Sequence, residues 1–208
     1  MDANVKILRR FVIYMAILTF VMFTLWAFVK SFKDRPPGDY ETEVCDIRLK
    51  DKEYDKALAA AQKALEKTPN HRGAIMCKAL VFISQKNYIE ADKELTYLII
   101  FLEKNLQKDD RTGIGTLAAA YANRGIIKDR NKNYQGALQD YIKALGIDDE
   151  AVAGPGLGTI ILNYKFKSSS VKERALYLNE QLQLPEEERV LSIKELDEGQ
   201  VMHKPGKL

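Results

Sequence analysis

The chain has 208 residues, 29% of them charged, and a formal net charge of +3. Residues 1–35 hold six of the 32 Lys and Arg and two of the 29 Asp and Glu, which leaves 26 basic and 27 acidic side chains in residues 36–208. A nucleic-acid-binding surface is therefore not expected. Two cysteines and two histidines are too few for a disulfide framework or a metal site, so we expect neither a metal nor a cofactor.

Residues 11–29 form an apolar segment of 19 residues without a charge. A helix of this length spans roughly 28 Å, close to the hydrocarbon thickness of a bilayer. We expect an uncleaved transmembrane helix after a basic tail at 1–10. A cleaved signal peptide would have a shorter apolar core and small residues before the cut. A buried helix of a soluble protein would not be apolar on all sides between basic clusters.

Basic residues flank this segment almost equally, with three in residues 1–10 and three in residues 30–35. The positive-inside rule therefore gives almost no preference for either orientation of the helix in the membrane. The short basic tail favours the N-terminus inside, so the predicted location is a bacterial inner membrane with the folded domain on the periplasmic side. Residues 30–39 are predicted to be a linker, because Pro36, Pro37 and Gly38 break a helix.

Three helical segments open with a tyrosine that is followed three residues later by an alanine. The pairs are Tyr54 and Ala57, Tyr88 and Ala91, and Tyr134 and Ala137. The first two pairs lie 34 residues apart and the last two lie 46 apart, which is the same period plus 12. The helix before the third pair carries Tyr121 and Gly125. A 34-residue period with these aromatic and small residues resembles the tetratricopeptide repeat (TPR).

The resemblance implies an all-α fold, a TPR-type solenoid of helical hairpins over residues 40–183 with helices that cap its C-terminal end. Two antiparallel helices pack closely only where side chains are small, as Gly125 with Ala137 and Ala79 with Ala91 would allow. One hairpin cannot bury its apolar face alone, so the repeats stack and form a concave groove. An Ala-rich bundle that shows this spacing by chance is the alternative.

The 12 additional residues indicate an extended hairpin at 87–130 that projects beyond the solenoid. Its lining is predicted to be Leu98, Ile99, Ile100, Phe101, Leu102, Ile114 and Leu117. Five consecutive apolar residues cannot all face one side of a helix. Part of this set is therefore expected either in the core or on a surface for a partner.

The resemblance also allows a specific test of the groove. Members of the family that bind the acidic C-termini of chaperones carry cations on their first helices. The aligned residues here are Thr42, Asp46, Cys77, Ala119 and Asn123. Asp46 would repel a carboxylate, so that function is not expected. A groove for an apolar helix or an extended peptide is predicted instead. Its residues are Met76, Leu80, Ile83, Ala122, Asn123, Ile126, Asp129 and Arg130.

The C-terminal part departs from the repeat pattern. Residues 153–158 are interpreted as the interrupted start of a fourth first helix, because they lack the pattern of a phosphate loop. Ser170 and Glu173 predict a capping box at the start of a helix with an apolar stripe. Residues 184–208 are predicted to form a short acidic helix from Pro185 and a flexible tail.

Cys45 and Cys77 are expected as buried structural thiols, and a bond between them requires Cα atoms within about 7 Å. No catalytic constellation is present, so no enzyme activity is expected. The predicted function is a membrane-anchored scaffold that binds a protein partner as an assembly or stabilising factor for a membrane complex. The alternative is a receptor or chaperone-like binder of transiting polypeptides. Protein and, through the anchor, membrane lipid are the expected partners, without nucleic acid or a small-molecule substrate.

Overall fold

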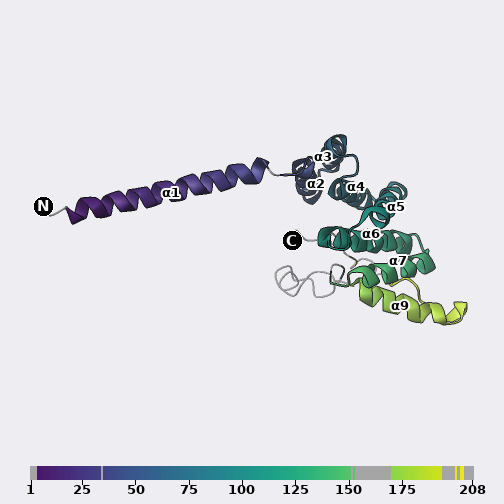
Figure 1. Cartoon of the computed structure of the whole chain (residues 1–208). Coiled ribbons are helices and arrows are strands. Elements are labelled where there is room, and N and C mark those ends of the chain that lie inside the picture. Colours follow the sequence, from purple (N-terminus) through teal and green to yellow (C-terminus); the bar gives the residue numbers. More distant parts are fainter. Residues whose placement is uncertain are drawn as a thin grey trace. The chain divides into compact units, whose positions relative to one another are not determined.

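The computed structural model describes residues 4–33, 35–150, 152, 170–193, 200, 202 and 203. Within these ranges the chain folds into helices joined by short turns and contains no β-strand (Figure 1). It divides into two compact units, Met1–Pro37 and Gly38–Leu208.

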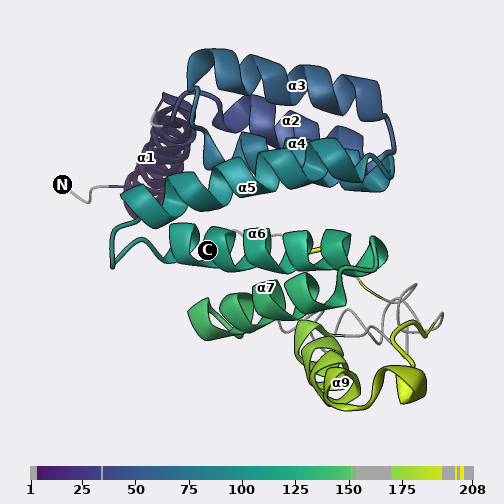
Figure 2. The same cartoon turned by 90° about the vertical axis from the view of Figure 1, so that its right-hand side faces the viewer.

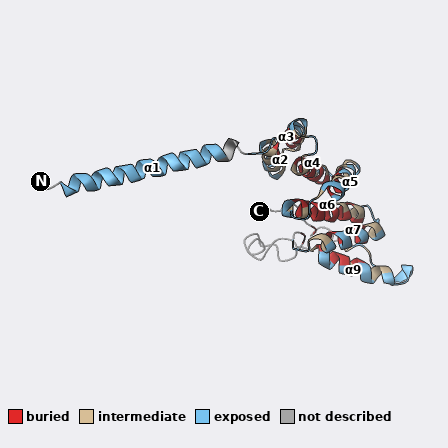
Figure 3. Cartoon of the chain, in the orientation of Figure 1, coloured by how far each residue is buried: buried red, intermediate tan, exposed pale blue. Residues whose placement is uncertain are grey.

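The first unit contains a single described helix, α1 (Val5–Lys33), of 29 residues. The most apolar 18 residues within 5–30 of this helix have a mean hydropathy of 2.3, and none of the residues 5–30 is buried (Figure 3). By length and composition the helix is sufficient to cross a membrane. It is longer than the apolar segment at 11–29, because it includes Arg9 and Arg10 of the predicted tail and Lys30 of the predicted linker.

The second unit stacks three helical hairpins and a closing helix (Figure 2). The hairpins pair α2 (Asp39–Lys50) with α3 (Tyr54–Lys67), α4 (Arg72–Ser84) with α5 (Tyr88–Asn105), and α6 (Arg111–Arg130) with α7 (Tyr134–Ile147). The closing helix α9 (Val171–Gln183) packs against α7. The predicted all-α solenoid of helical hairpins is thus confirmed.

The same turn joins the two helices of each hairpin. Its central residue is a lysine in the left-handed region, with φ of 60° at Lys52, 61° at Lys86 and 62° at Lys132. The N–H groups of the lysine and of the next residue donate to carbonyl oxygens in the last turn of the first helix, which gives those carbonyls a partner. The tyrosine of each Tyr-x-x-Ala pattern follows two residues after the lysine, so this turn fixes the register of every repeat.

Small residues allow the helices of a hairpin to approach closely. Ala57, Ala91 and Ala137 are fully buried. A Cβ on Gly125 would lie 2.6 Å from the ring of Tyr141 and 3.3 Å from the carbonyl oxygen of Ala137. Glycine is therefore required where α6 crosses α7.

Helices α5 and α6, which lie in the predicted extended hairpin at 87–130, are the longest described helices of this unit, with 18 and 20 residues. Helices α2, α3, α4 and α7 have 12 to 14 residues. The predicted hairpin residues divide into three groups. Leu98, Ile99, Leu102 and Leu117 are buried in the core, Phe101 and Ile114 are half-buried, and Ile100 is 60% exposed. Most of the apolar run therefore stabilises the fold.

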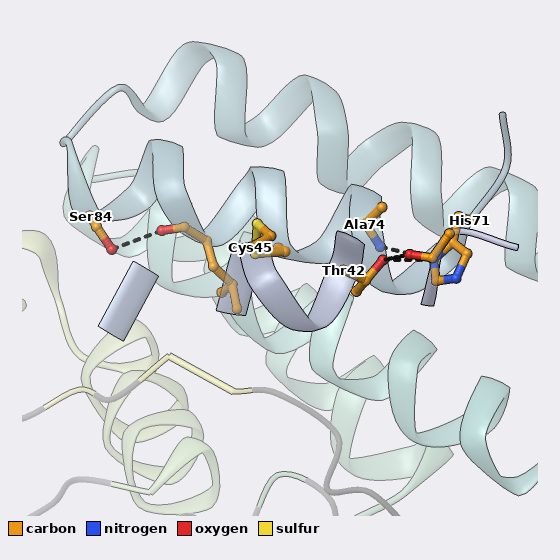
Figure 4. Close-up of a disulfide and its surroundings, with 8 residues drawn as sticks. Thr42, Cys45, His71, Ala74 and Ser84 are labelled. Atoms are coloured by element: carbon orange, nitrogen blue, oxygen red, sulfur yellow. Dashed lines mark hydrogen bonds between the residues drawn. A yellow bond between two sulfur atoms is a disulfide. The ribbon is translucent and has the colours of Figure 1, made fainter. Parts of the chain in front are cut away.

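A disulfide joins Cys45 on α2 to Cys77 on α4 (Figure 4). The two Cα atoms are 6.4 Å apart, and both residues are fully buried. The expectation of two free thiols is therefore replaced by a covalent link between the first two hairpins. Beside it, the Nδ1 atom of His71 accepts a hydrogen bond from the N–H of Ala74 and so caps α4.

The capping box at Ser170 is present. The N–H of Glu173 donates to Ser170 Oγ over 3.1 Å, and the N–H of Ser170 donates to a carboxylate oxygen of Glu173 over 3.0 Å. Of the predicted acidic helix the structure describes the part up to residue 193, and there it forms the 3₁₀ turn Glu186–Glu188 without further helix. Side chains of α9 bond both polar main-chain atoms of Val190, which prevents a helix from continuing there. The interpretation of residues 153–158 lies outside the described residues.

Substitution of Gly125 by alanine should destabilise the solenoid, because the new methyl group would overlap the ring of Tyr141. Overpacking of this kind costs about 1–3 kcal/mol in free energy of unfolding. Gly146→Ala is the matched control on α7, since no atom lies within 4 Å of a Cβ there and alanine favours a helix. Thermal denaturation followed by circular dichroism should give a lower Tm for Gly125→Ala only. Equal Tm values for the two variants would contradict the packing.

Candidate functional site

The predicted groove residues lie on α4 and α6, the first helices of the second and third hairpins, which pack against each other. The structure brings them together, since the Asn123 side chain approaches Met76 Sδ to 3.6 Å. Seven of the eight are nevertheless buried, and only Arg130 is half-buried. The prediction of an open apolar groove is therefore not what the structure contains.

Residues near the C-terminus of the same chain cover part of this residue set. The Nδ2 atom of Asn123 donates to the carbonyl oxygen of His203 over 2.7 Å, and the His203 N–H donates to Asn123 Oδ1 over 2.8 Å. One side-chain amide thus pairs with both polar main-chain atoms of a residue 80 positions away. Asn123 is fully buried, so these two hydrogen bonds satisfy a group that would otherwise be costly to bury. Met202 packs against the neighbouring core.

The second anchor of this segment is Asp129. Its carboxylate is held by Arg174 of α9 through two N–H···O hydrogen bonds of 2.8 Å, from Nε and from one terminal nitrogen. The hydroxyl of Tyr141 donates to it over 3.1 Å, and the Nε2 atom of Gln200 donates to it over 2.9 Å. Asp129 is predicted from the sequence as a groove residue, whereas the structure buries it in a polar cluster.

The charges in this cluster explain its electrostatics. Arg174 is 1% exposed, and its guanidinium also donates to the carbonyl oxygen of Leu191 over 2.9 Å. Burial, followed by the negative charge of Asp129, raises the pKa of the Tyr141 hydroxyl well above its usual value. The phenol therefore stays protonated at physiological pH, donates to Asp129 and accepts from Gln200 at 3.2 Å.

A pocket of about 560 Å³ opens beside the docked segment. It lies where the second and third hairpins end, and the C-terminal residues form one of its walls. Its lining is Ile83, Ser84, Lys86, Tyr88, Asp129, Arg130, Lys132, Tyr134, Ser192, Gln200 and Met202. Lys86 and Lys132 are the left-handed residues of two repeat turns, and Arg130 lies over the ring of Tyr88 at 5.9 Å. Three cations and two tyrosines thus surround the open part of the predicted groove, which suits an acidic or carbonyl-bearing group.

Sequence reasoning missed Tyr141, Arg174, Gln200 and His203 as parts of this site. One signal was present in the sequence. Arg174 falls between Val171, Ala175 and Leu178 on the apolar stripe of its helix, at the spacing of a buried face. A charge at such a position needs a partner, and Asp129 is that partner.

In the part of the chain that the structure describes, no group of three or more His, Cys, Asp or Glu side chains is placed to hold a metal ion. The site is built from hydrogen-bonding groups and apolar walls, which suits it to hold a peptide.

The docked segment should respond to pH through His203. Burial lowers the pKa of its imidazole from 6.5 to about 4, and Arg174 and Tyr141 line the same small space. Because the pKa is lower in the docked state, docking has its full stability above pH 6.5 and loses it as the pH falls from 6.5 towards 4.

NMR titration of His203 in the full chain should accordingly give a pKa far below 6.5. In Asn123→Ala, which removes both main-chain hydrogen bonds, the value should return towards 6.5. A wild-type His203 that already titrates near 6.5 would show that the segment is not docked.

No protein-family model matches the sequence, and no curated protein matches it. Among solved structures, the Arabidopsis OM64 TPR domain is similar, with a TM-score of 0.45 and 18% sequence identity, over 55% of this chain and 84% of that chain. The likeness concerns the fold alone, and the helical-repeat fold of this chain stands on its own hairpins and turns.

Proposed function

We propose that this protein is a membrane-anchored scaffold of TPR-like repeats that binds a segment of another protein, as an assembly or stabilising factor for a membrane complex. The observation that carries the proposal is the main-chain pairing of Asn123 on α6 with His203. A buried carboxamide that bonds both the N–H and the C=O of one residue is a device for holding a polypeptide. The open basic pocket beside it offers room for side chains of a partner.

The anchor in this proposal is α1. Its apolar segment at residues 11–29 has no buried residue, and a helix that is apolar on all sides is stable in lipid. We place the repeats on the periplasmic side of a bacterial inner membrane. The disulfide between Cys45 and Cys77 supports that side, because disulfides persist in oxidising compartments and are rare in the cytosol.

Proteolysis of right-side-out membrane vesicles should therefore digest the repeats while leaving α1 protected. In intact cells, a maleimide should label Cys45 and Cys77 only after denaturation and reduction. Protected repeats together with thiols that label without a reductant would place the domain in the cytosol and overturn this orientation.

A receptor for transiting polypeptides is the second candidate, and one observation favours it. Asn123 bonds only main-chain atoms of His203, so this contact does not select a side chain. A receptor would use such a contact to bind many sequences, each weakly. An assembly factor would add selective contacts in the pocket and hold one partner in a fixed ratio.

Photo-crosslinking in living cells should separate these candidates. A benzoylphenylalanine at Tyr88, which lines the pocket, should capture one protein if the chain is an assembly factor and many if it is a receptor. Tyr97 is the matched control. It lies on the same helix nine residues later, about half a turn out of phase, and is 49% exposed. No crosslinked protein at Tyr88, or the same products at both positions, would contradict a binding site at the pocket.

A further inference from the structure

The main-chain pairing at Asn123 determines what kind of segment this site can hold. Asn123 bonds both the N–H and the C=O of His203. Inside an α-helix the N–H of a residue bonds four residues back and its C=O bonds four residues ahead, so neither group is free for a side chain of another element. The main chain held at Asn123 is therefore not helical at His203. Gln200, three residues earlier in the chain, bonds Asp129.

Asn123 and Asp129 recognise different features of the segment. Asn123 pairs with main-chain atoms and accepts any residue. The Asp129 carboxylate and the Tyr141 hydroxyl both accept from the side-chain amide of Gln200, so this position requires an N–H donor. Met202, which packs against the core, indicates an apolar residue just before the main-chain anchor. The described contacts define a pattern of an N–H donor, an apolar residue two positions later, and directly after it a residue held by its backbone.

The chain itself now occupies these positions. Gln200 is 9% exposed and His203 is 8% exposed, so the groups that they bond are closed to another polypeptide while the segment is docked. A partner can reach Asn123 and Asp129 only when this segment leaves. Its apparent affinity is then the intrinsic affinity multiplied by the fraction of molecules in which the segment is not docked.

We propose that the C-terminal segment around Gln200 and His203 is an internal competitor, and that the partner is a non-helical peptide which reproduces its donor, apolar and main-chain contacts in the same groove. This inference rests on the proposed function and adds two things to it. It excludes a partner helix at this site, and it makes binding a replacement of one segment by another.

The test uses the full chain in detergent micelles and a fluorescent synthetic peptide with the sequence of residues 197–206. The variant Gln200→Ala weakens the internal segment but leaves Asn123, Asp129 and Tyr141 in place. The peptide should bind this variant at least tenfold more tightly than the wild type, as measured by fluorescence anisotropy. Gln183→Ala, at an exposed position at the end of α9, is the matched control and should bind like the wild type.

Two further measurements identify the contacts. A peptide whose glutamine is replaced by glutamate should bind Gln200→Ala at least tenfold more weakly, because Asp129 repels the carboxylate. Adding Asn123→Ala to the Gln200→Ala chain should lower the affinity for both peptides by a similar factor.

The outcomes distinguish a failure of internal competition from a failure of the peptide-binding groove. Equal, Asn123-dependent affinity for the wild type and Gln200→Ala would overturn internal competition and leave a peptide-binding groove intact. Absence of binding to Gln200→Ala, or binding that Asn123→Ala does not change, would overturn the groove itself and with it the proposed function.

Discussion

The ion pair between Asp129 and Arg174 is the contact on which the C-terminal half of this protein depends. Both side chains are buried, and removing each from water costs several kcal/mol, which is offset only when the charges are paired and hydrogen-bonded. Tyr141 and Gln200 add hydrogen bonds to the carboxylate, and Leu191 accepts one from the guanidinium. The cluster therefore fixes α6, α7, α9 and two later pieces of chain at one point. Loss of either charge would leave the other buried without compensation, and that is why the arrangement is specific.

Helix α6 is held from a second side by another set of charges. Arg124 donates two hydrogen bonds of 2.8 Å to Asp140 of α7, and Lys128 lies 2.7 Å from the same carboxylate. Arg124 also lies over the ring of Tyr121. With Gly125 against Tyr141 between these two groups, α6 is fixed in both rotation and distance relative to α7. Asn123 and Asp129, both on this helix, are therefore held in a fixed position relative to α7.

The repeat architecture could be predicted from the sequence because its causes are local. A tyrosine and an alanine three residues apart, a glycine that must face an aromatic ring, and a capping box at Ser170 all act within a few residues or one helix pair. The site could not be predicted in the same way. Its contacts join residues 71 and 80 positions apart through single polar atoms, and such pairs leave no periodic trace. The apolar residues chosen as a groove were correctly placed on α4 and α6, but their hydrophobicity marked the core. The disulfide could not be predicted, because the repeat pattern gives no distance between the Cα atoms of Cys45 and Cys77.

In the proposed membrane-anchored protein, the link between Cys45 and Cys77 has a mechanical consequence when the repeats are pulled at their N-terminal side. The residues between the two cysteines form a closed covalent loop that contains the whole of α3. A pulling force that enters along the chain at Gly38 reaches Cys45 and crosses the sulfur bridge to Cys77 and α4. Helix α3 then carries no load, and the first hairpin cannot be drawn out of the stack residue by residue. Tension at this side is delivered directly to the second hairpin, at helix α4, which itself carries Met76, Leu80 and Ile83 of the predicted groove.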